Sequence, residues 1–173
     1  MITTSRLRLQ PGTVEIFEAE LSGDQKRFSA LLGVTDGSEW PPIGGEHDAD
    51  AVAFFRSQLM AEPANAGWGV YYACLGAALV GSGGYFGPPQ EGVVEVGYSV
   101  CSNRRGEGIA TELVGGLIAN AQARAVRRLT AHTKPDNSAS VAVLRHNRFE
   151  LGASLRADHL RFALDLAFDP ALV

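Results

Sequence analysis

The sequence predicts a single α/β (α+β) domain, in which helices flank a mixed central sheet of about six or seven strands. Three observations support this prediction. The chain has 173 residues, of which 46% are hydrophobic, and this is enough for one compact core. Short segments with β-type alternation are interspersed with longer segments that have helical spacing. No internal repeat, low-complexity tract or linker interrupts the chain, so residues 1–173 are expected to form one domain.

The first part of the chain predicts one strand and three helices, over Arg6–Leu9, Val14–Leu21, Asp24–Leu32 and 48–60. In the last of these segments Asp48 or Asp50 can cap the helix through its carboxylate. Residues 33–45 are rich in turn formers and contain Trp40-Pro41-Pro42, so an ordered loop is expected between the second and third helices.

A run without any charged residue extends from Trp68 to Gly87 and is about as long as a membrane span. Its many glycines are more typical of strands and turns than of a helix that faces lipid. The run therefore predicts two buried strands, Val70–Leu75 and Ala78–Phe86, joined near Gly76. A membrane partner is not expected.

The rest of the chain predicts strands at Val93–Cys101, Arg128–Thr133, Phe149–Ala153 and Leu160–Phe168, and helices at about Gly108–Ala125 and 137–147. Val93–Cys101 is the clearest strand, because its even-numbered residues from Val94 to Val100 are apolar or aromatic and share one face. The Gly115-Gly116 pair lowers the stability of its helix, so a close packing partner is expected there.

Charge and cysteine usage exclude several classes of function. The formal net charge of −4 and the pI near 5.5 disfavour binding to nucleic acid or to anionic lipid. Cys74 and Cys101 lack the spacing of a metal site or redox motif, so both are expected to be buried thiols and no metal is expected. The first residues lack the apolar segment of a secretion signal, which predicts a cytoplasmic protein.

The most informative segment is the turn Arg104-Arg105-Gly106-Glu107-Gly108-Ile109-Ala110, between a strand and a helix. Such a turn exposes backbone N–H groups at the positive end of the helix dipole, which favours a phosphate or diphosphate ligand. A dinucleotide-binding motif would need glycine or alanine at Thr111, and a P-loop would need Gly-Lys-Ser/Thr. Neither occurs, and a glycine-rich turn without any ligand stays an alternative on these residues alone.

The same turn resembles the Arg/Gln-x-x-Gly-x-Gly/Ala pattern of the GNAT superfamily of acyl-CoA N-acyltransferases. Glu95-Val96-Gly97-Tyr98 resembles its central strand, and Asn137-Ser138-Ala139-Ser140 resembles its Asn-x-x-Ser segment. The opening residues 4–9 and the Trp40-Pro41 loop are similar to the branch that acetylates ribosomal-protein N-termini. The sequence departs from the family at Arg148, where glycine usually precedes the phenylalanine of the last motif.

The resemblance implies a GNAT-like sheet that is splayed between its two central strands, and acetyl-CoA as co-substrate. It implies that the turn binds the diphosphate, that the central strand pairs with the pantetheine arm, and that a backbone N–H near the strand end polarises the thioester. The residues implied to bind the cofactor are Tyr98, Ser99, Val100, Arg104, Arg105, Gly106, Glu107, Gly108, Ile109, Ala110 and Asn137.

Acyl transfer to an amine needs a base for the ammonium and benefits from an acid for the leaving thiolate. Glu95, flanked by valines, is the candidate base, with a purely structural carboxylate as the alternative. Ser140 is the candidate acid by resemblance, although it could be an ordinary serine in the first turn of a helix, and Tyr98 is the reserve acid.

His132 is the histidine most worth attention. Cys101 has no histidine partner in the sequence, so direct transfer in a ternary complex is expected.

These features together predict an N-acetyltransferase that acts on a primary amine, either a protein N-terminus or a small molecule. A non-catalytic acyl-CoA-binding or sensing domain is the alternative, and retention of both Glu95 and Ser140 argues against it. A nucleotide-dependent oxidoreductase is a weaker third interpretation. Exposed strand edges could also pair two copies into a homodimer.

Overall fold

The computed structural model describes residues 1–37, 39–42, 47–153 and 158–166. In this part of the chain, eight strands form one mixed sheet in the order β1-β2-β3-β4-β5-β6-β8-β7. The strands are β1 (Ile2–Thr3), β2 (Leu7–Pro11), β3 (Val70–Leu75), β4 (Ala78–Tyr85), β5 (Val93–Val100), β6 (Arg128–Thr133), β7 (Glu150–Gly152) and β8 (Leu160–Asp165). The α-helices are α1 (Val14–Leu21), α2 (Gln25–Leu32), α3 (Ala49–Ala61), α4 (Ile109–Ala123) and α5 (Ser138–His146).

The predicted fold class and the order of elements are confirmed. The structure adds β1, a strand of two residues that is too short for alternation to reveal. Of the two candidate caps Asp48 and Asp50, Asp48 caps α3, and Asn137 caps α5, since each side chain accepts a hydrogen bond from the first turn of its helix. Parts of the predicted loop 33–45 and the end of the predicted strand 160–168 lie outside the described residues.

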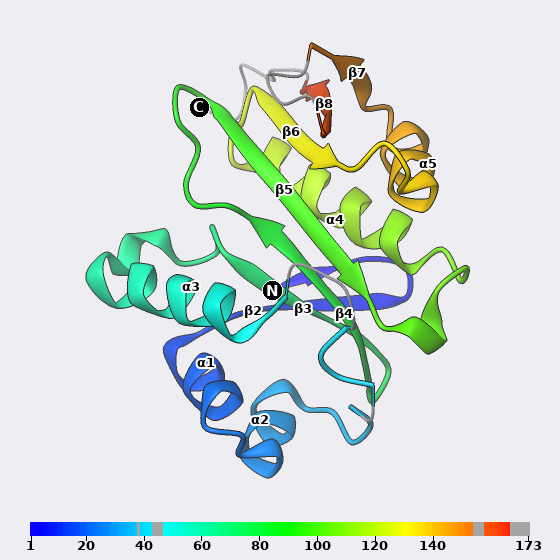
Figure 1. Cartoon of the computed structure of the whole chain (residues 1–173). Coiled ribbons are helices and arrows are strands. Elements are labelled where there is room, and N and C mark those ends of the chain that lie inside the picture. Colours follow the sequence, from blue (N-terminus) through cyan, green and yellow to red (C-terminus); the bar gives the residue numbers. More distant parts are fainter. Residues whose placement is uncertain (38, 43–46, 154–157, 167–173) are drawn as a thin grey trace.

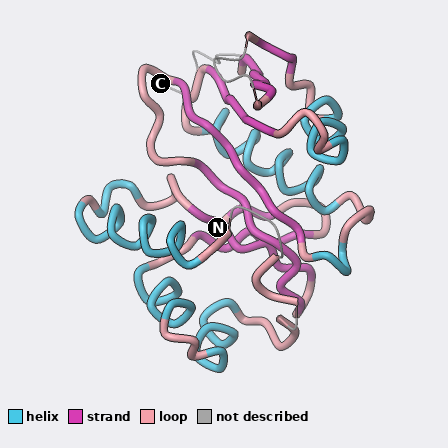
Figure 2. Tube along the Cα trace, in the orientation of Figure 1, coloured by secondary structure: helices cyan, strands magenta, loops and turns pink. Residues whose placement is uncertain are grey.

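The helices form two layers, one on each face of the sheet (Figures 1 and 2). On one face α1, α2 and α3 cover Tyr72, Cys74 and Leu79. On the other face α4 packs its buried residues, including Leu113 and Leu117, against apolar side chains of β2 to β6, and α5 adds Leu144. Both faces of the central strands are therefore buried, which explains why β4 carries no charged residue.

The glycines of β4 are required by close backbone contacts rather than by turns. A Cβ at Gly84 would lie 2.1 Å from the carbonyl oxygen of Gly69, and one at Gly81 would lie 2.4 Å from that of Ser99. The uncharged run thus belongs to two sheet strands, as predicted. No helix among the described residues is both long and apolar enough to cross a bilayer.

The sheet is splayed between β5 and β6, as the resemblance implies. Antiparallel pairing of β5 with β4 joins residues 96–100 to residues 81–85. Parallel pairing with β6 is confined to Val93–Glu95 opposite Arg128–Thr130. Beyond Glu95 the two strands diverge, and a gap opens toward the start of α4 and α5 (Figure 1).

Candidate active site

A cavity of about 770 Å³ occupies the gap between β5 and β6. Its walls come from β5, from the turn that enters α4, from the end of β6 and from the first turn of α5. This volume is in the usual range for small-molecule sites, about 300–1,000 Å³. Nearly all predicted site residues line it; the exceptions are Glu107 and Glu95.

The backbone of β5 faces this cavity at alternate residues. Glu95 accepts a hydrogen bond from Phe86 through its carbonyl oxygen, and the N–H of Cys101 donates to Val80, so both residues face β4. Because backbone groups alternate along a strand, Val96, Tyr98 and Val100 turn their N–H and C=O groups toward the β6 side. The backbone of the predicted site residue Ser99 faces β4 instead.

The turn between β5 and α4 has the geometry that a phosphate site needs. Gly106 and Gly108 have φ values of 81° and 76°, which glycine adopts without a steric penalty. The first hydrogen bond of α4 runs from the N–H of Glu112 to the carbonyl of Gly108, at 3.0 Å. The N–H groups of residues 108–111 precede it and have no partner within the helix.

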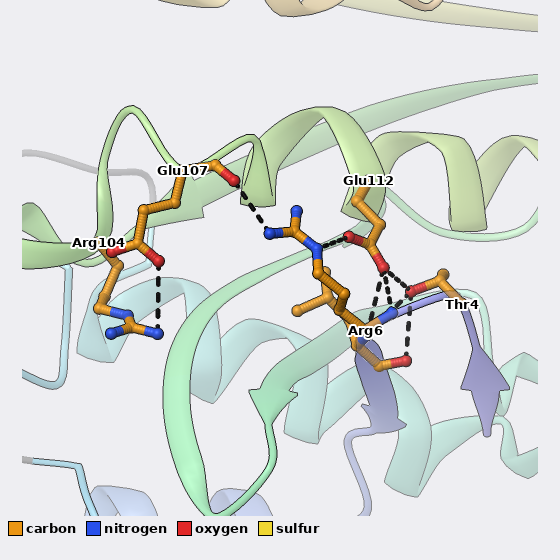
Figure 3. A network of polar contacts seen from close by, with 6 residues as sticks. Thr4, Arg6, Arg104, Glu107 and Glu112 are labelled. Atoms are coloured by element: carbon orange, nitrogen blue, oxygen red, sulfur yellow. Dashed lines mark hydrogen bonds and ion pairs between the residues drawn. The ribbon is translucent and has the colours of Figure 1, made fainter.

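Two arginines flank the turn in different ways. Arg104 lies 3.4 Å from the Glu107 carboxylate through Nη2 (Figure 3), while its buried Nε has no hydrogen-bond partner among the described residues. Arg105 bends back and donates from Nε to the carbonyl oxygen of Val100 at 3.3 Å. The turn therefore carries positive charge directly beside its backbone donors.

The start of α5 brings together the two candidate acids. Asn137 caps this helix by accepting the N–H of Ser140 at 3.1 Å. The hydroxyls of Ser140 and Tyr98 lie 2.9 Å apart, so either can donate to the other. The Tyr98 hydroxyl also lies 3.2 Å from the carbonyl oxygen of Ser140. Ser140, the candidate acid, and Tyr98, the reserve acid, thus form one hydrogen-bonded pair.

The candidate base Glu95 forms a pair with His132, the histidine singled out in the sequence. Nδ1 of His132 lies 2.8 Å from Oε1 of Glu95. His132 lines the cavity and Glu95 does not. The two side chains are 33% and 38% exposed, so the carboxylate is less removed from water than its valine neighbours suggest. With Glu95 ionised, Nδ1 is the donor and Nε2 of a neutral His132 keeps its lone pair.

The comparison with protein families decides what kind of cavity this is. The model of the acetyltransferase (GNAT) domain matches residues 19–150. This chain belongs to the GNAT family of acetyltransferases. As a GNAT acetyltransferase, it is an enzyme that takes its acyl group from an acyl-CoA.

Known relatives of this GNAT chain agree with that assignment. The uncharacterized N-acetyltransferase YjdG of Bacillus subtilis is 29% identical over 148 residues, which cover 83% of this chain and 86% of YjdG. One similar solved structure is that of RimL, a ribosomal L7/L12 alpha-N-protein acetyltransferase, in complex with coenzyme A. Its TM-score is 0.67 at 18% identity, and the match covers 96% of this chain and 97% of the RimL chain. The ribosomal-protein-alanine N-acetyltransferase of Brucella melitensis has a TM-score of 0.60 at 23% identity, with 92% and 99% covered.

Cys101 lies outside the cavity of this GNAT chain. Its side chain is fully buried, and Sγ lies 3.9 Å from the carbonyl oxygen of Leu79. Burial raises the pKa of the Cys101 thiol, and the Glu39 carboxylate raises it further. The thiol is therefore protonated at neutral pH and is a poor nucleophile. Among the described residues, no group of three potential metal ligands occurs.

Sequence analysis missed a second, smaller cavity on the α3 face. It has a volume of about 60 Å³ and shares the lining residues Gly97, Tyr98 and Ser99 with the first cavity. His47 and Phe55 form part of its wall. Nε2 of His47 lies 2.8 Å from Oε1 of Glu20.

Glu20 has two further partners in the same layer. It accepts hydrogen bonds from Nε1 of Trp40 at 2.7 Å and from the hydroxyl of Tyr72 at 2.5 Å. Burial and the Glu20 charge raise the pKa of Tyr72, which stays a donor. The Trp40-Pro41 motif was the available signal for this cluster, but no sequence spacing links Glu20 to His47.

Proposed function

We propose that this chain transfers an acetyl group from acetyl-CoA to a primary amine, by direct attack within a ternary complex. The observation that carries the proposal is the cavity between β5 and β6, which connects the glycine turn to the open edge of β5 and to the Tyr98–Ser140 pair. All of residues 1–173 act as one N-acetyltransferase domain in this proposal. The complexes of RimL with coenzyme A and of Salmonella typhimurium yncA with acetyl-CoA, both with the same fold, support it.

The coenzyme binds along two backbone surfaces. Its diphosphate accepts hydrogen bonds from N–H groups of the turn at residues 105–110, and Arg104, which lines the cavity, adds positive charge. Its pantetheine arm pairs with the edge of β5 from Tyr98 to Val100, as an added strand would. Asn137 supports the opposite wall through its cap on α5.

The Glu95–His132 pair accepts the proton that the ammonium must lose before it can attack. The carboxylate orients the ring through Nδ1, and the proton passes to Nε2 of His132, directly or through water. The neutral nitrogen then forms a bond to the thioester carbon, and the carbonyl π electrons move onto oxygen. The N–H of Val100 stabilises this oxyanion.

The Tyr98–Ser140 pair completes the reaction on the sulfur side. When the carbonyl reforms, the C–S bond breaks and the sulfur leaves as a thiolate. The nitrogen loses its second proton and the sulfur gains one, so the hydrogen-bonded hydroxyls act as the acid and recover the proton from the amide nitrogen. No acyl-enzyme is formed, in keeping with the raised pKa of Cys101.

The acceptor amine enters from the α3 face, through the smaller cavity, which shares the wall residues 97–99 with the coenzyme cavity. The acceptor class is a primary amine on a protein N-terminus or on a small molecule. Similarity to RimL favours the former, and similarity to the microcin C7 self-immunity acetyltransferase MccE, solved with acetyl-CoA and AMP, favours the latter.

The decisive experiment measures thiol release from acetyl-CoA in the presence of many acceptors, including peptides with varied first residues and small cationic amines. Release that depends on one class of acceptor is the expected result. If coenzyme A binds in calorimetry but no acceptor gives thiol release, the chain is a non-catalytic acyl-CoA-binding domain instead. If coenzyme A does not bind at all, the proposal fails.

A further inference from the structure

We infer that Arg6 is a positioning residue for the diphosphate site: it fixes the orientation of the Glu107–Gly108 peptide, and so presents the N–H of Gly108 to the coenzyme. The inference rests on the proposed function, because it assumes that the turn binds a diphosphate. Arg6 belongs to the N-terminal segment before β2, about one hundred residues from the turn in sequence, and it does not line the cavity.

The observation that carries the inference is a hydrogen bond from Nη1 of Arg6 to the carbonyl oxygen of Glu107, at 3.2 Å (Figure 3). The guanidinium also lies against Gly108, where an added Cβ would be 3.5 Å from Nη2. In a trans peptide the C=O and the following N–H point in opposite directions. A carbonyl held toward Arg6 therefore directs the N–H of Gly108 away from Arg6, and Gly108 lines the cavity.

This peptide needs an external constraint because glycines stand on both sides of Glu107. Gly106 and Gly108 both have positive φ, and glycine can also adopt negative φ at little cost. A Cβ at Gly106 would meet no atom within 4 Å, so side-chain packing does not hold the turn there. Rotation of the peptide would point the carbonyl oxygen at the diphosphate and replace attraction by repulsion.

Arg6 is itself fixed by the carboxylate of Glu112 in the first turn of α4. Nε of Arg6 lies 2.6 Å from Oε2 of Glu112, and the Arg6 backbone N–H donates to Oε1 at 2.6 Å. Thr4 donates to Oε1 through its hydroxyl, also at 2.6 Å (Figure 3). The guanidinium thus bridges a rigid helix turn and the glycine turn, and its planar shape suits both contacts at once.

The test compares Arg6→Gln with the wild-type protein by calorimetry of coenzyme A and by steady-state kinetics. We expect coenzyme A to bind roughly 10–150-fold more weakly, because the N–H of Gly108 would lose its hydrogen bond to a charged ligand. We also expect KM for acetyl-CoA to rise more than kcat falls. With S-acetyl-pantetheine, which lacks the diphosphate, kcat/KM should change by less than about 2-fold. Arg128→Gln is the control, because Arg128 is a similarly exposed arginine that pairs with the carboxylate of Asp165 far from the turn.

Two further results separate positioning from simple charge attraction. Arg6→Lys keeps the charge but cannot make both contacts, so it should stay at least about 3-fold weaker than wild type. Full recovery in Arg6→Lys would overturn the inference, as would unchanged coenzyme A affinity in Arg6→Gln. An equal loss with S-acetyl-pantetheine would overturn it too, since the damage would then extend beyond the diphosphate. Wild-type protein that binds no coenzyme A would instead refute the proposed function.

Discussion

Each proton-transfer group that we propose for the site is a pair of side chains from different elements. Tyr98 on β5 meets Ser140 on α5, and Glu95 on β5 meets His132 on β6. Tyr98 and Ser140 are 42 residues apart in sequence, and Glu95 and His132 are 37 residues apart. Sequence analysis named all four residues, yet it treated them as separate candidates. No local pattern encodes a contact that the path of the chain creates.

The first prediction concerns the acid pair. Ser140→Ala and Tyr98→Phe should each lower kcat by roughly 100-fold, the lower end of the range for general acid catalysis. The double variant should lose little more than either single variant, because the two hydroxyls share one proton path. Steady-state kinetics at saturating acetyl-CoA measure this effect. Ser57→Ala, which removes an exposed helix hydroxyl that donates to the carbonyl oxygen of Ala53, is the control. Fully additive losses in the double variant would show that Ser140 and Tyr98 do not share one proton path.

The second prediction concerns Glu95 and His132, the pair that we propose as the general base. Glu95→Gln and His132→Gln should each reduce kcat/KM for the amine by about 100-fold. The affinity for coenzyme A should stay within about 2-fold of wild type, because neither side chain is proposed to touch the coenzyme. Steady-state kinetics with varied amine and calorimetry of coenzyme A measure the two effects. If either variant turns over at the wild-type rate, that residue has no part in proton removal.

At the scale of elements, α5 shows how a departure from the family pattern is accommodated. The helix ends in two hydrogen bonds, from Phe149 N–H to Leu144 and from Arg148 N–H to Arg145. This arrangement is a Schellman motif, which requires a left-handed residue and usually has glycine there. Arg148 adopts the same conformation with φ of 64°. The turn geometry is retained at a conformational cost to an arginine.

The third prediction follows from that cost. Arg148→Gly should stabilise the protein by about 1 kcal/mol, because left-handed backbone costs a non-glycine residue about 1–2 kcal/mol, partly offset by the entropy of glycine in the unfolded chain. Urea unfolding at neutral pH measures the change. Arg145→Gly, inside the last turn of the same helix, is the contrasting variant and should destabilise by about 1 kcal/mol. A loss of stability in Arg148→Gly would mean that the arginine side chain has stabilising contacts.

The elements themselves could be predicted because their signals are local. Helices with side-chain caps, such as α3 and α5, begin where Asp48 and Asn137 indicate. Packing explains Gly116 of the Gly115-Gly116 pair, since a Cβ there would lie 2.8 Å from Thr4, whereas a Cβ at Gly115 would make only an ordinary contact with Asn147 at 3.5 Å. Prediction was weakest where the determinants are distant, as for β1 and for the Glu20–His47 contact.

At the scale of the whole molecule, Glu112 joins the N-terminal segment to α4. Partial burial alone would raise the pKa of this carboxyl, but hydrogen bonds from Thr4 and Arg6, together with the Arg6 charge, lower it to about 2. The side chain is only 15% exposed, so solvent screens these contacts weakly. The contact between the N-terminal segment and α4 therefore depends on pH.

The fourth prediction uses the sign of that shift. Because the folded-state pKa is lowered, the stabilisation is complete above the unfolded value near 4.5 and is lost as pH falls toward 2. Glu112→Gln should cost about 3 kcal/mol at pH 7 and much less at pH 3, measured by urea unfolding at both values. Asp165→Asn is the control, since its carboxyl is 72% exposed and should contribute little. An equal cost at both pH values would contradict the prediction.

The narrow pairing between β5 and β6 has a mechanical consequence. Strands β1 to β5 and strands β6 to β8 are two continuous ladders. In the part of the chain that the structure describes, the strand pairing that connects them is limited to three residue pairs, Val93–Glu95 with Arg128–Thr130. The angle between the two ladders is thus set by how side chains such as Leu113 and Leu144 fill the space beneath them. A substitution in that buried layer can widen or narrow the mouth between the ladders without breaking a single backbone hydrogen bond of the sheet.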